Sequence, residues 1–137
     1  MSRGRSSQKT VLKTVKTKGK ESSVQSIGES CTIGTINKLK ESNKEGFFAI
    51  ITQEGCAPCL PVKDALKEAV KGKLPIIEIP ARQANCEGLI KKLDVTQTPT
   101  ILYLKEGSRM KRIAEGGETF DQVKDRVADI LQSVSKK

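Results

Sequence analysis

Two cysteines separated by two residues, Cys56 and Cys59, are the residues whose type and spacing point most directly to a chemistry. They follow an apolar run over residues 47–51 and precede a stretch with helical periodicity, so we expect both thiols at the start of a helix. Unpaired backbone N–H groups and the positive end of the helix dipole would favour the thiolate of Cys56 there. Such a pair can exchange electrons with other dithiols, although the motif alone also fits half of a zinc site.

The two remaining cysteines, Cys31 and Cys86, lie far apart in the sequence and form no second close pair. Zinc sites built from four cysteines usually need two close pairs, and the chain has no His to replace one, so we expect no metal and no other cofactor. We interpret Cys31 and Cys86 as small buried or unused thiols. A structural disulfide between them is the alternative, because such bonds persist inside the cells of hyperthermophiles.

The composition indicates one domain with an aliphatic core. The chain has 137 residues, of which 36% are hydrophobic, and this length accommodates a single domain and a tail. Three Phe, one Tyr and no Trp leave Ile, Leu and Val to fill the core, and the lack of His excludes His-based catalysis. No apolar run is long enough to cross a bilayer, so we expect no membrane span.

Most of the net charge of +9 lies in residues 1–28, where one Glu accompanies a set of basic residues: Arg3, Arg5, Lys9, Lys13, Lys16, Lys18 and Lys20. We expect residues 1–28 to be a flexible, disordered tail and residues 29–137 to form the domain. A second interpretation is that residues 3–20 contact nucleic acid or another anionic surface, and a third is a mitochondrial-type presequence. The tail lacks the apolar segment of a secretory signal, so we expect a cytoplasmic location.

Hydrophobic patterning predicts alternating helices and strands over the domain. We expect helices over residues 35–42, 56–71, 85–93 and 119–134, and strands over residues 47–52, 74–80, 100–104 and 109–114. Asn85 and Thr119 are the expected N-caps of the last two helices, and Phe120 is expected on the apolar face of the last one. This order describes an α/β fold with a mixed central sheet flanked by helices.

The order of these elements and three local motifs resemble the thioredoxin-like family over roughly residues 30–134. Cys56-Ala57-Pro58-Cys59 matches the family's dithiol motif, and Thr98-Pro99-Thr100 matches its segment with a cis-proline. Residues 100–107 match the strand and hairpin turn that follow, and Gly116 matches a glycine near the active-site rim. A cis bond before proline costs only about 0.5–1 kcal/mol over trans, so Pro99 can place the Thr98 backbone beside the thiols.

The resemblance implies a thiol–disulfide oxidoreductase that exchanges a Cys56–Cys59 disulfide with protein substrates. In the family the first thiol attacks and the second, buried thiol resolves the mixed disulfide, so Cys56 would be the nucleophile and Cys59 the resolving thiol. The residues expected to contact the substrate are Ala57, Pro58, Thr98, Pro99 and Gly116. An upstream reductase or oxidant would have to recycle the pair.

Several positions depart from the family's pattern. Gly55 stands where reducing members usually carry an aromatic residue, and Ile50 stands where they carry a buried Asp. Glu78, on the next strand, replaces the usual Lys, so we interpret it as a buried proton acceptor for the resolving thiol. The alternative is that Glu78 only points toward the end of the sheet. Pro61 is a further departure, since a proline inside a helix can kink or loosen it.

A second function from another class also fits the sequence. The chain would then be a thioredoxin-fold interaction or structural module in a larger assembly, associated with nucleic acid through its basic tail, with the dithiol vestigial or structural. The intact dithiol and Thr98-Pro99 favour the oxidoreductase, whereas Gly55, Ile50 and the basic tail favour the module. A glutaredoxin-like interpretation ranks third, because Gly116-Gly117 is similar to that family's glycine pair but the proline segment is not.

Overall fold

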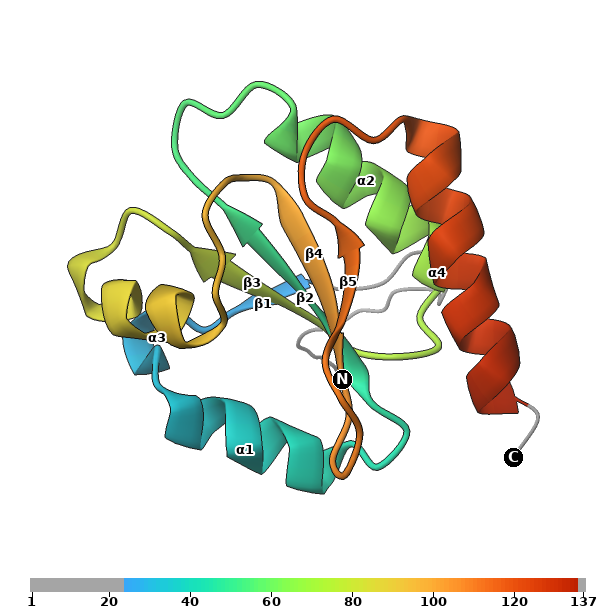
Figure 1. Cartoon of the computed structure of the whole chain (residues 1–137), viewed down its shortest axis with the longest axis horizontal. Helices are drawn as coiled ribbons and strands as arrows, with labels where there is room; N and C mark the ends of the chain where they lie inside the picture. The colour runs from blue at the N-terminus through green and yellow to red at the C-terminus, as the bar shows by residue number, and fades with distance from the viewer. Residues whose placement is uncertain (1–23, 136–137) are drawn as a thin grey trace, which may run out of the picture.

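A mixed five-stranded sheet organises residues 24–135, the part of the chain that the computed structural model describes (Figure 1). The strands are β1 (Val24–Ser26), β2 (Phe47–Thr52), β3 (Ile76–Pro80), β4 (Thr100–Leu104) and β5 (Lys111–Ala114). They lie in the order β1-β3-β2-β4-β5, where β1 and β2 run parallel to β3 and β4 runs antiparallel to β2 and β5. The helices are α1 (Ile33–Ser42), α2 (Cys59–Val70), α3 (Glu87–Lys92) and α4 (Phe120–Ser135), with 3-10 turns η2 (Gly28–Ser30) and η3 (Ala84–Cys86). This arrangement confirms the predicted fold class.

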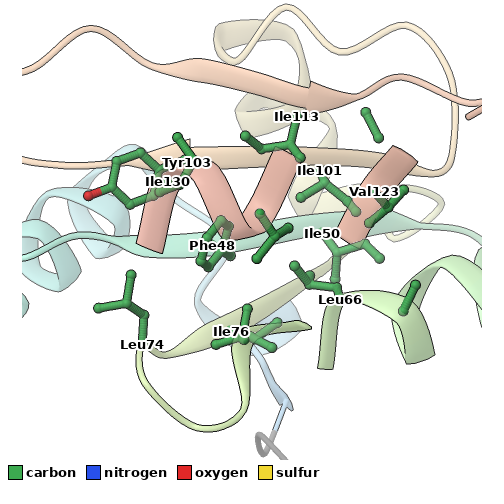
Figure 2. Close-up of a cluster of buried hydrophobic side chains, with 14 of the residues drawn as sticks. Phe48, Ile50, Leu66, Leu74, Ile76, Ile101, Tyr103, Ile113, Val123 and Ile130 are labelled. Atoms are coloured by element: carbon green, nitrogen blue, oxygen red, sulfur yellow. The ribbon is translucent and has the colours of Figure 1, made fainter. Parts of the chain in front are cut away.

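Each face of the sheet carries its own apolar core. Strand β2 is buried along its whole length, as its unbroken apolar sequence predicts for a central strand with both faces covered. Its Phe48 and Ile50 contact the core under α2 and α4, whereas Phe47, Ala49 and Ile51 contact the core under α1 and α3. Figure 2 shows the first of these cores, in which side chains from the sheet meet Leu66 of α2 and Val123 and Ile130 of α4.

Helix α2 begins at Cys59 and tolerates Pro61 in its first turn. Pro58 is the N-cap residue, and its carbonyl oxygen accepts the first helical hydrogen bond from the Val62 N–H at 3.3 Å. Pro61 therefore falls within the first turn, where a backbone N–H has no carbonyl partner inside the helix and its loss is harmless. Pro61 therefore deletes no hydrogen bond of α2, contrary to the expectation for a proline inside the helix.

Two of the predicted features at the other helices are wrong. The Asn85 side chain does not cap α3, because its Nδ2 donates to the carbonyl oxygen of Gly28 instead. Phe120 does not join the apolar face of α4, since it is 42% exposed. Thr119 does cap α4 as predicted: its Oγ1 accepts from the Gln122 N–H at 3.1 Å, and its own N–H donates to Gln122 Oε1 at 2.9 Å.

The domain begins earlier than the sequence predicts. Residues 24–26 form strand β1, which pairs in parallel with β3, so the ordered domain starts no later than Val24 and not at residue 29. The basic residues from Arg3 to Lys20 lie outside the described residues, and the predicted contact with nucleic acid or an anionic surface lies there too. Within residues 24–135, no helix is both long and apolar enough to cross a bilayer.

Candidate functional site

The dithiol and the proline segment come together at one edge of the sheet. Strands β2 and β4 are antiparallel with Ile51 opposite Thr100, so the end of β2 and the start of β4 lie at the same edge. The loop with Cys56 leaves β2 there, and Thr98-Pro99 leads into β4 there. A Cβ at Gly116 would lie 3.8 Å from the carbonyl oxygens of Thr98 and Pro99, which places this glycine beside the same segment. The Thr98–Pro99 peptide bond is cis.

A tight turn after β2 presents the first cysteine. The Cys56 N–H donates to the Gln53 carbonyl oxygen at 3.2 Å, which closes a four-residue turn, and Gly55 occupies its third position with φ +82°. That position in a type II turn favours glycine because a side chain is strained at positive φ. No atom lies within 4 Å of the point where a Gly55 Cβ would be, so the surface in front of Cys56 is open where the family has an aromatic side chain.

Cys56 and Cys59 form a disulfide whose two ends differ in exposure. Their sulfur atoms are 2.10 Å apart and their Cα atoms 5.4 Å apart. Cys56 is half-buried, whereas Cys59, the first residue of α2, is only 5% exposed. Ala57 and Pro58 between them are exposed. The pair can therefore be attacked from solvent at Cys56 but not directly at Cys59.

Glu78 faces helix α2 and belongs to a polar cluster. Thr52 Oγ1 donates to Glu78 Oε2 at 2.6 Å, and Lys63 Nζ lies 3.3 Å from Oε1 and 3.5 Å from Oε2. Lys63 follows Cys59 by four residues in α2, so the two residues lie on the same side of the helix, one turn apart. The carboxylate thus faces α2 through Lys63, the residue one turn after the resolving cysteine.

The burial expected for Glu78 needs correction. Its side chain is 23% exposed and that of Lys63 is 25% exposed, so the pair is partly open to solvent instead of fully buried. The carboxylate does lie near the end of the sheet, because its partner Thr52 is the last residue of β2, and it is paired there with Thr52 and Lys63. The sequence contained no signal for Lys63 or Thr52 as partners, since neither stands out by spacing.

Cys31 and Cys86 form a second disulfide, so the interpretation of them as unpaired thiols is wrong. The bond links the residue after η2 to the end of η3, with Cα atoms 4.9 Å apart. Cys31 is 4% exposed and Cys86 is fully buried, both within the core under α1 and α3. Gln83 Nε2 supports the link by donating to the Gly28 carbonyl oxygen at 3.0 Å.

With both disulfides formed, residues 24–135 contain no free cysteine. They also contain no group of three or more Cys, Asp and Glu side chains that could hold a metal ion. Of the two disulfides, only Cys56–Cys59 has a sulfur-bearing residue that is partly exposed.

Comparison with known proteins bears on the fold. No protein-family model matches the chain. The crystal structure of thioredoxin f from spinach chloroplast superposes with a TM-score of 0.64 at 18% identity, over 82% of this chain and 96% of that one. Thioredoxin from Trypanosoma brucei brucei gives a TM-score of 0.63 at 16% identity, over 86% and 99% of the two chains.

A third similar structure is the J-Trx1 fragment of ERdj5, with a TM-score of 0.60 at 15% identity over 82% of this chain. The present chain spans only 52% of that longer fragment. Identities this low establish a shared architecture, which agrees with the strand order and helix placement described above. Residues 24–135 therefore have the thioredoxin fold, and the resemblance found in the sequence is confirmed at the level of fold.

Proposed function

We propose that this chain is a thiol–disulfide oxidoreductase that exchanges its Cys56–Cys59 disulfide with protein substrates. The observation that supports this most strongly is the asymmetry of the pair at the sheet edge: Cys56 is accessible, and Cys59 is buried one position into α2. Thiol–disulfide exchange with a dithiol needs one thiol that the substrate can reach. It also needs a second thiol nearby that can attack the mixed disulfide and release the substrate. A purely structural disulfide has no need of an accessible sulfur, as Cys31–Cys86 illustrates.

The reaction in the reducing direction balances as two exchanges. The Cys56 thiolate attacks one sulfur of a substrate disulfide, that S–S bond breaks, and the released substrate thiolate takes up a proton. Cys59 then loses its proton and attacks Cys56 Sγ, which breaks the mixed disulfide and frees the second substrate thiol. The substrate gains two electrons and two protons, and the protein is left with the Cys56–Cys59 disulfide seen here. Oxidation of a substrate is the same sequence reversed.

The proton of Cys59 needs an acceptor, and we assign that role to Glu78. The carboxylate contacts Thr52 and Lys63, and Lys63 stands one helical turn after Cys59 on the same side of α2. Its half-buried setting leaves a path to bulk water, so a proton taken from Cys59 can leave the protein. Ile50 stands where the resemblance leads one to expect a buried Asp, and it is fully buried with no ionisable group. Glu78 lies opposite Ile50 in the register of β2 and β3, so in our proposal its carboxylate takes the place of that Asp.

The substrate would contact the residues around Cys56, of which Ala57 and Pro58 are exposed, Thr98 and Gly116 are half-buried, and Pro99 is buried. Ala57 and Pro58 flank the accessible sulfur, and Thr98-Pro99 enters β4 at the same edge with Gly116 beside it. Because these residues are uncharged, the substrate backbone around its cysteine can pack against them without removing a charged side chain of this protein from water. The upstream reductase or oxidant, the cytoplasmic location and the contact of residues 3–20 with an anionic surface stay predictions from the sequence.

A redox titration of the Cys56–Cys59 couple tests the function. The full chain is equilibrated in thiol–disulfide buffers of known potential, quenched with an alkylating agent and counted for modified cysteines by mass spectrometry. We expect reversible titration of two thiols at Cys56 and Cys59, and no such couple in the Cys56→Ser variant. A midpoint reduction potential of about −270 mV would identify a reductant, and one of about −120 mV would identify an oxidant. A pair that does not cycle would support the structural module instead.

A further inference from the structure

The side chain of Leu60 is the most exposed large hydrophobic side chain within residues 24–135. Its exposed fraction is 61%, compared with 42% for Phe120 and 38% for Ile33. An isolated exposed leucine needs no explanation, but Leu60 directly follows the resolving cysteine in the first turn of α2. Together with the exposed Ala57, Pro58 and Pro61, it forms an uncharged apolar surface around the dithiol, which we call the α2 apolar surface.

The geometry of a mixed disulfide brings a partner over this surface. Two cysteines joined by a disulfide have Cα atoms roughly 4.4–6.8 Å apart, so the cysteine bonded to Cys56 lies within that distance. The Cα atoms of Cys56 and Cys59 are 5.4 Å apart, and Leu60 is the next residue. An extended chain advances about 3.3 Å per residue, so residues about one to three positions from the partner's cysteine are within reach of the Leu60 side chain.

The remaining surroundings leave Leu60 as the main apolar contact beside Cys56. Gly55 has no side chain, and the space next to it is empty. Residues 57–62 contain no charged side chain, and the first cation of α2, Lys63, is held by Glu78. Exposed Glu54 and Asp64 lie on either side of this uncharged stretch, so the surface itself offers an apolar contact: an apolar partner side chain placed on it would remove Leu60 from water.

We propose that Leu60 and the α2 apolar surface select substrates in which an apolar side chain lies within about three residues of the reactive cysteine. This inference rests on the proposed function, since it concerns the partner in the mixed disulfide. The occupant is an extended segment of a substrate protein with an apolar side chain close to its cysteine. Leu60 is a specificity-determining residue in this account, and it takes no part in the exchange of electrons or protons.

Two model peptides test the inference on the full chain. Each carries one cysteine joined by a disulfide to a chromogenic aromatic thiol, and they differ only in having Leu or Ser at the positions flanking that cysteine. The protein is used with Cys56 and Cys59 reduced, and the release of the aromatic thiol is followed in a stopped-flow instrument. We expect the second-order rate constant to be roughly tenfold higher for the Leu peptide, as burial of this much of a leucine side chain implies.

The ratio of the two rate constants is the readout. We expect Leu60→Ser to bring the ratio close to one, and Leu60→Met to restore most of it. Ile33→Ser is the matched control, because Ile33 is also exposed but begins α1 on the opposite face of the sheet, and it should leave the ratio unchanged.

The outcomes separate this inference from the proposed function. An unchanged ratio in Leu60→Ser, or a wild-type protein that reduces both peptides at equal rates, would overturn the role of Leu60 and leave the oxidoreductase standing. A wild-type protein that reduces neither peptide would overturn the proposed function, and this inference with it.

Discussion

The Cys31–Cys86 disulfide should carry a large share of the domain's stability. It closes a loop with a sequence separation of 55, and the chain-entropy relation for such a loop gives about 4 kcal/mol at 25 °C. By the same relation, the Cys56–Cys59 ring, with a separation of 3, contributes less than about 2 kcal/mol. We therefore expect the buried disulfide to stabilise the fold by holding the segment after β1 in place. We expect reduction of the accessible disulfide to leave the protein folded.

The stability contribution of Cys31–Cys86 is best measured in a protein that lacks the Cys56–Cys59 disulfide. The reference protein is Cys56→Ala/Cys59→Ala, in which only Cys31–Cys86 can form. The test protein adds Cys31→Ala and Cys86→Ala. We expect the free energy of unfolding from urea titrations to fall by about 4 kcal/mol, and the Tm to fall by roughly 15–20 °C for a domain of this size. A matched control, Cys56→Ala/Cys59→Ala against the wild type, should lose less than about 2 kcal/mol.

Two results would contradict a stabilising contribution of this size from Cys31–Cys86. A loss below about 1 kcal/mol on removal of Cys31–Cys86 would show that the bond does not constrain the unfolded chain as the entropy relation requires. Equal ease of reduction would also contradict it, because Cys31 is 4% exposed, Cys86 is fully buried, and a thiolate must reach the sulfur that it attacks. Under mild reductant, alkylation should mark Cys56 and Cys59 and leave the buried pair unmodified.

Three further predictions follow from the polar groups. Glu78→Gln should slow resolution of the mixed disulfide by roughly tenfold at neutral pH, and the deficit should shrink as the pH rises and hydroxide takes over removal of the proton; an unchanged pH profile of disulfide exchange would remove Glu78 from the mechanism. Lys63→Met should shift that profile, whereas Lys63→Arg should retain it, because Arg keeps the ion pair with Glu78; equal profiles for both variants would show that the cation has no part. Burial, with a smaller effect from the charge of Glu45, raises the pKa of Tyr103, so the folded protein holds this proton more tightly than the unfolded chain. The resulting stability is complete below about pH 10 and is lost as the pH rises further. Tyr103→Phe should therefore flatten the fall of the urea midpoint at alkaline pH, at a cost of about 1 kcal/mol for the lost hydrogen bond to the Glu45 carbonyl oxygen; equal alkaline slopes in the two proteins would contradict this.

The sequence predicted those elements whose signal is continuous along the chain. Strand β2 is an unbroken apolar run, and such a run in a central strand is buried on both faces, as observed. The helix after the dithiol and the cap at Thr119 also follow from local periodicity and a local hydrogen bond. These features depend on neighbours in sequence, so a pattern reveals them.

Features that depend on contacts between residues far apart in the sequence could not be predicted from it. Asn85 has the residue type of a cap, but the Gly28 carbonyl oxygen, brought close by the fold, offers its side chain a better partner. Strand β1 is only three residues long and has no pattern of its own, since it forms by pairing with β3. The Cys31–Cys86 bond likewise depends on η2 and η3 meeting in space.

The candidate site divides in the same way. The motif identified Cys56 and Cys59 directly, whereas the setting of Glu78 required the structure. Its position on β3 suggested a buried acid, but the register of β2 and β3 and the packing of α2 supply Thr52 and Lys63 as partners. Leu60 carried no signal in the sequence, because an apolar residue in a helix is expected to face the core.

Trapping of the mixed disulfide shows which cysteine attacks the substrate and which one resolves the adduct. The reduced full chain, as wild type, Cys56→Ser or Cys59→Ser, is mixed with a protein that contains an accessible disulfide, quenched with acid and examined by mass spectrometry. We expect full reduction of the substrate by the wild type, a persistent adduct on Cys56 in Cys59→Ser, and no adduct at the dithiol in Cys56→Ser. An adduct on Cys59 in Cys56→Ser, or no thiol exchange in any of the three proteins, would contradict these roles of Cys56 and Cys59.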